Sequence, residues 1–427
     1  MNRPRIAVMG TFDTKAEEYQ YIIDRIGQLG ADVLTIDVST RDTAVLRGEY
    51  GCREIAQYAG STYELLTSGT RAESMAIIME GATKLVRQLL QEGRIQGLVS
   101  IGGSGGTTLA THVMRALPIG FPKVIATTQA CSDKLPGFIS GKDIIVINSV
   151  VDVSGLNSII SHVYDEAAGA VVGAALAYTP HPADKPRIAI SMYGITTPCV
   201  VHAAKYLETR GYEPIIFHAN GAGGKAMKTL IAEGMFQGVL DITTAEVGAY
   251  VLDAESSSAG EDRLDAAVLA GLPQVVSVGG MDVIGIRVDQ LHTKFQGYTP
   301  YSHNDKPDMI RTRPEDGIRI GQFMCRHLNN SIAPCAIYLP IRSLSSLDVA
   351  GGQTCDDEAR RVVAPYARGI LIPPTHPFLY RGQSPLCPPD PAWCGQRIQW
   401  GPRQSRRLCW GEEKSQSERA FAFQAAT

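Results

Sequence analysis

The chain has 427 residues, of which 44% are hydrophobic and 19% charged, with a formal net charge of −3 at pH 7. This length predicts two to three domains, and the apolar content predicts buried cores rather than a disordered chain. The nearly balanced charge gives no electrostatic case for nucleic acid or an anionic membrane as a partner. No apolar run approaches the roughly 20 residues of a transmembrane helix, and the first run is too short for a secretion signal, so we expect a cytoplasmic protein.

Nine cysteines are spread along the chain without a CxxC pair or a repeated spacing. Disulfide frameworks and structural zinc sites both need such spacings. We therefore predict neither a disulfide framework nor a metal site built on cysteine, and we assign no cysteine a catalytic role.

Strand-like and helix-like segments alternate through the first half of the chain. Short runs rich in Val and Ile predict strands at residues 5–10, 32–38, 95–101, 123–127 and 143–147. Amphipathic or alanine-rich stretches predict helices at residues 15–29, 69–92, 109–117 and 155–178. This alternation is typical of a parallel sheet covered by helices on both faces.

The pattern starts again after a proline-rich stretch, residues 179–186, that is typical of a linker. RIAISM at 187–192 is similar to RIAVMG at 5–10, and further strands are predicted at 214–217, 238–242 and 273–278. We predict an α/β protein with two tandem Rossmann-like subdomains, residues 1–178 and 187–352, each with a mainly parallel sheet flanked by helices. A ligand is expected in the cleft between them.

Residues 353–427 differ in kind from the rest. The stretch from 382 onwards contains all three tryptophans and three of the nine cysteines, and it shows no helical period before residues 412–426. We expect an atypical, poorly ordered carboxyl-terminal segment, with a docking tail as the alternative.

A glycine-rich run between a predicted buried strand and a predicted helix is the most informative segment. Its four glycines and three hydroxyl residues place several backbone N–H groups at the positive end of a helix, where phosphate is the commonest anion. The run matches neither a Walker A loop nor a GxGxxG fingerprint. A tight turn that only packs helix on strand is the alternative. The residues are Gly102, Gly103, Ser104, Gly105, Gly106, Thr107 and Thr108.

Other polar residues follow the neighbouring strands of the first half. Ligands of open α/β sheets gather at these carboxyl ends. Thr11 and Asp13 follow the first strand, and Asp13 is a candidate ligand for Mg²⁺ or a hydroxyl group. Lys15 is a candidate for a phosphate contact, and Thr127 follows the fourth strand. The alternative for the first turn is a helix cap at Asp13 or Thr14.

A second set of candidates lies in the second half. Glycines that open a helix suggest another phosphate turn, and polar residues at strand ends suggest a substrate cleft. A histidine and an arginine further along suggest a patch for a carboxylate or phosphate, although a lone histidine is more often structural. These residues are Gly223, Gly224, Asp241, Thr243, Thr244, Glu246, His303 and Arg311.

Ser104 also satisfies the G-x-S-x-G pattern of a hydrolase nucleophile elbow. An acid and a histidine would have to complete the site, and Asp133 or Asp152 with His162 or His202 are the candidates. None of these has a flanking signature, so this interpretation stays the rival from another class.

Several motifs in order resemble one known family. They include GTFDTK, SIGGSGGTTLAT, VVDVSGLN, MYGITTPCV, FHANGAGGKAM, GVLDITTAEV, SVGGMD and MIRT, between about residues 3 and 352. Together they are similar to the family built on the ATP-binding amino-terminal module of the tomato tobamovirus-resistance protein. The resemblance implies two Rossmann-like subdomains, a homodimer, and ATP bound largely by the first subdomain. Beyond Gly352 the sequence departs from the family pattern, which puts the end of the second subdomain in doubt.

The leading hypothesis is a nucleotide-binding protein that holds ATP, with or without Mg²⁺, by its phosphates on residues 102–108. Three alternatives stay open. They are an ATP-dependent enzyme acting on a small carboxylate or sugar-like substrate in the cleft, a serine hydrolase using Ser104, and a sensing module that contacts a partner. The sequence supplies no nucleic-acid or membrane motif for any of them.

Overall fold

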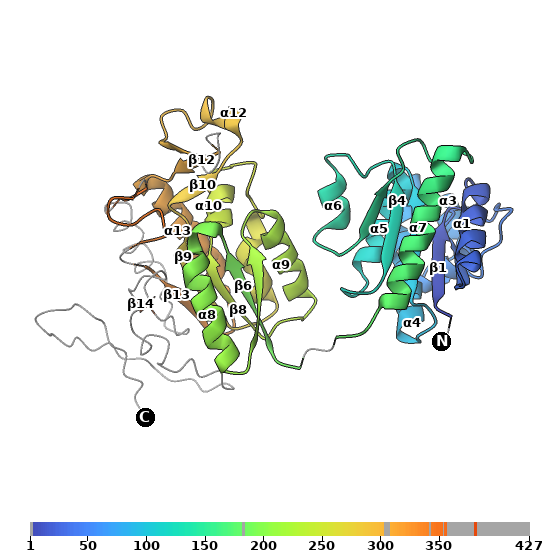
Figure 1. Ribbon diagram of the computed structural model, residues 1–427, viewed down its shortest axis with the longest axis horizontal. Helices are drawn as coiled ribbons and strands as arrows, with labels where there is room; N and C mark the ends of the chain where they lie inside the picture. Colours follow the sequence, from blue (N-terminus) through green and yellow to red (C-terminus); the bar gives the residue numbers. More distant parts are fainter. Residues whose placement is uncertain are drawn as a thin grey trace, which may run out of the picture. The chain divides into compact units, whose positions relative to one another are not determined.

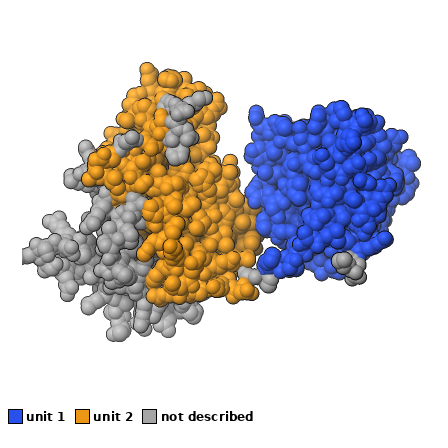
Figure 2. Space-filling view, viewed as in Figure 1, with its two compact units in different colours: residues 1–182 blue, residues 183–427 orange. Residues whose placement is uncertain are grey.

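The computed structural model describes residues 3–181, 184–302, 308–340, 343–352 and 354–356, with the backbone of residues 380 and 381. The chain divides into two compact units, unit 1 at residues 1–182 and unit 2 at residues 183–427 (Figure 2). Each unit has its own sheet and its own hydrophobic clusters.

Unit 1 is built on a five-stranded, fully parallel sheet in the order β2-β1-β3-β4-β5. The central strand β3 is buried along its whole length, as expected for a strand covered on both faces. The parallel sheet predicted from the alternating pattern is therefore confirmed. The strands are β1 (Arg5–Gly10), β2 (Asp32–Asp37), β3 (Gly97–Gly102), β4 (Lys123–Thr127) and β5 (Ile145–Asn148).

Helices cover both faces of this sheet (Figure 1). One face packs against α1 (Ala16–Gln28) and α7 (Ser158–Ala177). The other face packs against four helices, α2 (Cys52–Tyr58), α3 (Tyr63–Ser68), α4 (Arg71–Gln91) and α5 (Ser104–Arg115). The short α6 (Leu135–Ile139) follows β4. Since α1 after β1 and α5 after β3 lie on opposite faces, the chain diverges between these two strands, where open α/β sheets bind ligands.

One buried tyrosine links the ends of β1 and β3. The Tyr19 hydroxyl, on α1, donates to the Ile101 carbonyl at 2.8 Å and accepts from the Ile101 N–H at 3.2 Å. A Cβ on Gly10 would lie 1.7 Å from the Tyr19 ring, so only glycine fits at the end of β1. Burial raises the pKa of Tyr19 to about 12, which keeps the hydroxyl protonated and able to donate.

Unit 2 repeats the same strand order. Its parallel strands run β13-β9-β8-β6-β7, and β14 (Tyr380–Arg381) pairs with the outer edge of β13. The two tandem Rossmann-like α/β folds predicted from the sequence are confirmed. The strands are β6 (Arg187–Met192), β7 (Glu213–His218), β8 (Gly238–Thr243), β9 (Gln274–Gly279) and β13 (Cys335–Tyr338).

Two helices of unit 2 pack on opposite faces of its parallel sheet. Cluster residues place α8 (Thr197–Thr209) against Ile188 and Ile190, and α9 (Ala222–Ala232) against Ala189, whose side chain points to the opposite face. A small antiparallel sheet, β10 (Val283–Gly285), β12 (Met309–Arg311) and β11 (Pro300–Tyr301), adds to the parallel one. The remaining helices are α10 (Ala245–Val251), α11 (Asp265–Leu269), α12 (Val288–Leu291) and α13 (Pro314–Leu328).

Two expectations from the sequence need correction. Helix α5 begins at Ser104 rather than at Leu109, because Gly102 and Gly106 pack so closely that the helix starts directly behind the strand. Helix α1 is capped by neither Asp13 nor Thr14, since Lys15 occupies the cap position. The predicted helix at 412–426 and most of the segment 353–427 lie outside the described residues.

Candidate functional site

The amino terminus of α5 presents unused hydrogen-bond donors at the carboxyl edge of unit 1. Gly103 is the cap residue and has no side chain that could bond to the helix, and the first turn contains no acidic residue. The first helical bond runs from the Thr107 N–H to the Gly103 carbonyl, at 2.9 Å. The N–H groups of the three residues before it, Ser104, Gly105 and Gly106, have no acceptor among the described residues.

The glycines of this run have different reasons to be glycine. A Cβ on Gly102 would lie 2.9 Å from the Cα of Gly106, so packing of helix on strand excludes any side chain there. A Cβ on Gly103 would meet nothing nearer than 3.9 Å, and one on Gly105 nothing nearer than 3.8 Å. Gly103 also has an ordinary negative φ of −80°. The protein itself therefore has room for a side chain at Gly103 and Gly105, and the empty space lies beside the free amides.

Thr107 and Thr127, both predicted to contact a ligand, are fully buried and hold the turn in place. The Thr107 hydroxyl donates to the Gly103 carbonyl at 2.7 Å and lies 2.5 Å from the Thr127 hydroxyl. The Thr127 hydroxyl also accepts from the Gln129 N–H at 2.9 Å. Thr108 lies on the outer side of α5, where its hydroxyl donates to the Ser104 carbonyl at 2.9 Å.

The turn after β1 lies at the same carboxyl edge. Thr11 and Thr14 hydroxyls are 3.1 Å apart, and the Asp13 carboxylate is exposed without a partner in the described residues. The Lys15 ammonium donates to the Val153 carbonyl and lies 4.0 Å from Glu18, so this side chain joins the turn to the segment after β5.

Asp37, at the end of β2, fixes the turn after β1. Its Oδ1 accepts from the Phe12 N–H at 3.1 Å and from the N–H and hydroxyl of Ser39. Only 5% of Asp37 is exposed, and this burial raises the pKa of its carboxyl group. Its second oxygen, Oδ2, has no hydrogen bond among the described residues. Sequence reasoning missed Asp37, although an acidic residue ending the second strand of an α/β unit is a known signal.

Two more residues lie near the α5 terminus: Arg71, which the sequence did not indicate, and Thr128, which follows Thr127 directly after β4. Arg71, the first residue of α4, places Nη2 3.8 Å from the position that a Cβ would take on Gly105. The Thr128 hydroxyl lies 3.9 Å from the corresponding position on Gly103. No sequence signal identifies Arg71, because 31 positions separate it from Gly102 and only the fold brings it to this edge.

Ser104, the candidate nucleophile, is the first residue of α5 and is exposed. In the part of the chain that the structure describes, no hydrogen bond joins its hydroxyl to a histidine. His162 lies exposed on α7, and His202 lies on α8 of the other unit. Within unit 1, Ser104 and His162 therefore do not form the hydrogen-bonded pair that activates a nucleophile.

The equivalent edge of unit 2 is filled by side chains. Glu246 is fully buried, and its Oε1 accepts from the N–H groups of Gly221, at 2.6 Å, and Gly224, at 3.0 Å, at the amino terminus of α9. Its Oε2 accepts from Nε of Arg263 at 2.6 Å. Arg263 also makes two hydrogen bonds to the buried Asp241, at 2.7 and 3.0 Å. These residues form a closed ionic triad.

The glycines and threonines predicted for the second half belong to the same packing. A Cβ on Gly223 would lie 1.9 Å from the His218 carbonyl oxygen, and one on Gly224 would lie 2.2 Å from Oε2 of Glu246. The Thr243 hydroxyl lies 2.7 Å from that of Thr196, and the Thr244 hydroxyl donates to the Ser277 carbonyl at 2.8 Å. Both threonines are fully buried.

Arg311 and Asp282 form a second buried polar cluster in unit 2. The Arg311 side chain donates to the carbonyls of Thr354, Asp282 and Thr312 at 2.7, 3.1 and 2.9 Å. Asp282 Oδ2 accepts from the hydroxyls of Ser345 and Thr354, while its Oδ1 is buried without a partner among the described residues. Burial raises the pKa of Asp282. His303, predicted beside Arg311, lies outside the described residues.

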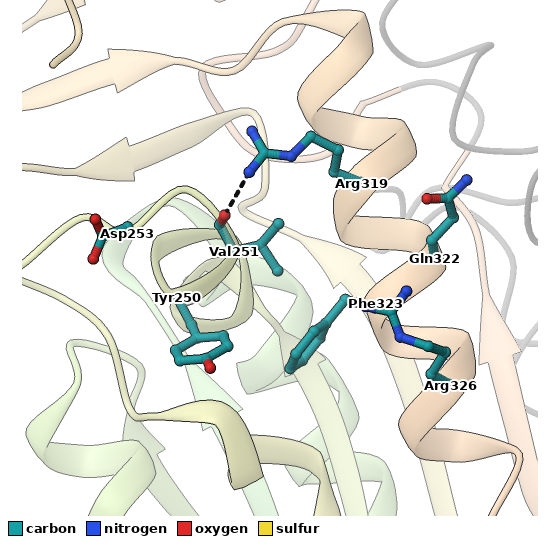
Figure 3. Close-up of a pocket in the computed structure, with 7 residues that line it drawn as sticks. All are labelled: Tyr250, Val251, Asp253, Arg319, Gln322, Phe323 and Arg326. Atoms are coloured by element: carbon teal, nitrogen blue, oxygen red, sulfur yellow. Dashed lines mark hydrogen bonds between the residues drawn. The ribbon is translucent and has the colours of Figure 1, made fainter.

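A pocket of about 500 Å³ opens between α10 and α13 of unit 2 (Figure 3). Arg319 donates to the Val251 carbonyl at 3.0 Å, and the rings of Tyr250 and Phe323 are 5.4 Å apart. None of the residues predicted from the sequence lines this pocket. Its lining is Tyr250, Val251, Asp253, Arg319, Gln322, Phe323 and Arg326.

The described residues contain no group of three or more His, Cys, Asp or Glu side chains placed to hold a metal ion. Burial raises the pKa of Cys52 to about 11 and that of Cys335 to about 12, so both stay in the unreactive thiol form near neutral pH. Across the described ranges, no helix has the length and apolar character to cross a membrane.

Two family models match the chain. Residues 4–180 match the N-terminal domain and residues 185–371 the C-terminal domain of an uncharacterised protein family (UPF0261). A UPF0261 protein of Clostridium tetani is 39% identical over 354 residues, which are 82% of this chain and 87% of that protein. The ToMV resistance protein Tm-1 of Solanum lycopersicum is 30% identical over 385 residues, which cover 84% of this chain and 50% of that protein.

Likeness to solved structures is much weaker. UDP-N-acetylglucosamine 2-epimerase from Rickettsia bellii aligns with 64% of this chain and 79% of its own, at 9% identity and a TM-score of 0.24. A likeness at this level carries no argument about function. The resemblance stated from the sequence motifs is confirmed by the family models and by the two relatives.

Proposed function

We propose that this chain, which belongs to the UPF0261 protein family, binds ATP through unit 1, with the phosphates seated on the amino terminus of α5. One observation carries the proposal: the free N–H groups of Ser104, Gly105 and Gly106 border a space that the glycines leave empty. Such amides, together with the positive end of the helix dipole, are the usual protein ligands of a phosphate group.

The position of this terminus supports the same function. It lies at the carboxyl edge of the sheet, between strands whose following helices cover opposite faces, where ligands of α/β proteins bind. Among phosphate ligands, the resemblance of the motifs to an ATP-binding module favours ATP. We assign the exposed Asp13 to a Mg²⁺ ion held between the turn after β1 and the phosphates, because carboxylate oxygens are preferred Mg²⁺ ligands. Thr11 and Lys15 shape that turn.

Isothermal titration of the purified chain with ATP, with and without Mg²⁺, tests the proposal. Gly103→Val places a side chain in the empty space at a φ that valine readily adopts, so it should lower ATP affinity at least about tenfold. Gly169→Ala is the control, because Gly169 is exposed on α7 with nothing within 4 Å of its Cβ position. Unchanged ATP affinity in a folded Gly103→Val variant would refute the phosphate site.

A further inference from the structure

Arg71 is a cation without a counter-charge beside the α5 terminus. It is exposed, it begins α4, and it forms no ion pair among the described residues. Its neighbour Glu73 forms no ion pair with it, and Oε2 of Glu73 accepts from the N–H and the hydroxyl of Thr70 at 2.7 and 2.8 Å. With Nη2 3.8 Å from the Cβ position of Gly105, the guanidinium borders the same empty space as the free amides.

Asp37 supplies an unused acceptor on the other side of β1. Its Oδ1 holds the turn after β1, whereas its Oδ2 has no hydrogen bond in the described part of the chain. The residue is 5% exposed, so the open oxygen belongs to a side chain that is otherwise fixed. A carboxylate can only accept hydrogen bonds, and its natural partner on a nucleotide is a hydroxyl group of the sugar.

The sheet sets the separation of the strand ends at which Asp37 and the α5 amides lie. β2 and β3 are the two neighbours of β1, and adjacent strands lie about 4.8 Å apart, so their ends are about 10 Å apart across β1. An extended triphosphate and its ribose span a comparable length. A carboxylate at the end of β2 and the free amides that follow β3, with the Arg71 guanidinium beside them, therefore match the two ends of one ligand.

We propose that a nucleoside triphosphate lies across the end of β1, with its terminal phosphate between Arg71 and the α5 amides and a ribose hydroxyl on Oδ2 of Asp37. This inference rests on the proposed function, and it adds which end of the ligand each strand recognises. The planar guanidinium can give two parallel hydrogen bonds to a phosphate, which a lysine cannot. The site thus distinguishes a triphosphate from a monophosphate and a ribose from a deoxyribose.

The phosphate end is tested by titrating ATP, ADP and AMP into the full chain and into Arg71→Ala. We expect ATP affinity to fall about 10- to 100-fold and AMP affinity to change less than about threefold, since only the longer ligand reaches the guanidinium. Arg71→Lys should recover only part of the loss. Arg87→Ala is the matched control, because Arg87 is exposed on the same helix α4, about 24 Å along its axis.

The sugar end is tested first without any variant. We expect either 2′-deoxy-ATP or 3′-deoxy-ATP to bind the unmodified chain about tenfold more weakly than ATP. Asp37→Asn, checked for a native circular dichroism spectrum, should reduce that difference. Equal affinities for ATP and both deoxynucleotides would overturn the role of Asp37, whether or not the variant folds.

The outcomes separate this inference from the function on which it rests. An unmodified chain that binds none of the nucleotides refutes the proposed function and this inference with it. If the unmodified chain binds ATP and Arg71→Ala binds it equally well, or loses ATP and AMP affinity alike, the contact of Arg71 with the terminal phosphate is refuted and the proposed function is not.

Discussion

The two units have the same strand order but differ at the carboxyl edge of their sheets. Three residues beyond the end of β3, unit 1 has Gly105, which leaves space and free amides. Three residues beyond the end of β8, unit 2 has Glu246, whose carboxylate is bound by the amides at the start of α9 and by Arg263. The amides at the start of α5 in unit 1 have no acceptor among the described residues, whereas unit 2 supplies an anion of its own at its edge.

This difference shows that glycines in a helix-opening turn do not by themselves indicate a ligand. Gly223 and Gly224 are required by the protein, because any side chain there would meet the His218 carbonyl or Glu246. Gly103 and Gly105 meet no such obstacle. Gly103 and Gly105 are the more informative glycines, because the described residues give no steric reason for the lack of a side chain at either position.

The largest expected effect comes from disrupting the buried ionic triad of unit 2. Arg263→Ala leaves Asp241 and Glu246 as uncompensated buried charges, so we expect unit 2 to lose about 3–5 kcal/mol of unfolding free energy. Urea unfolding followed by circular dichroism measures the loss. Arg287→Ala removes an exposed arginine that pairs with Glu255 and Asp289, and it should leave the free energy of unfolding nearly unchanged. Equal effects of the two variants would mean that the triad is not structural.

A second variant should give the edge of unit 2 free amides, as the edge of unit 1 has. Glu246→Ala frees the amides of Gly221 and Gly224 and leaves Arg263 half paired, so a small external carboxylate can take the vacated place. We expect formate to restore about 1.4 kcal/mol at roughly ten times its Kd. Thermal unfolding with formate, and with chloride at equal ionic strength, measures this. If formate stabilises the unmodified chain by as much, the edge was not filled by Glu246.

A substitution at Gly105 in unit 1 should raise thermal stability and lower the affinity for ATP. Gly105→Ala improves helix propensity by about 0.5–1 kcal/mol but places a methyl group in the space beside the amides. We expect a higher thermal midpoint together with weaker ATP binding. Gly169→Ala on α7 should give the stability gain alone. Unaltered ATP binding in Gly105→Ala would show that ligands do not approach this turn.

The smallest expected effect is a pH dependence of the stability of unit 2. Burial raises the pKa of Asp282, so the folded state holds this proton more tightly than the unfolded state. The stability that this proton contributes is therefore fully present below the ordinary aspartate pKa of about 3.9, and it is lost as pH rises through the raised pKa of the folded state. Asp282→Asn should flatten the dependence of urea midpoints on pH from pH 4 upwards. Parallel curves for the two proteins would contradict this assignment.

The sequence predicts most of the fold because its strands are short, continuous apolar runs between polar turns. The start of α5 was missed because glycine has a low helix propensity, and only the close contact of Gly102 with Gly106 shows that the helix begins at once. The strand at Cys335–Tyr338 and the small antiparallel sheet have no strong periodicity and were also missed.

The candidate site was predictable only in part. Residues 102–108 carry a local signal, because strand, glycines and helix follow one another directly. Arg71 carries none, since its contact with the α5 terminus depends on the path of α4 back across the sheet. Asp241 and Glu246 were predicted as strand-end residues of a substrate cleft. They are bound instead by Arg263, which no sequence motif marks.

The hydroxyl of Tyr19 has a consequence for how the edge of unit 1 responds to a ligand. Because it bonds both main-chain groups of Ile101, the residue before Gly102, α1 and the glycine turn are parts of one stiff framework. A framework that is already ordered loses little conformational entropy on association, so more of the interaction free energy appears as affinity. Hydrogen exchange at Ile101 and in α1 should then be slow in the free chain and change little when a ligand is added.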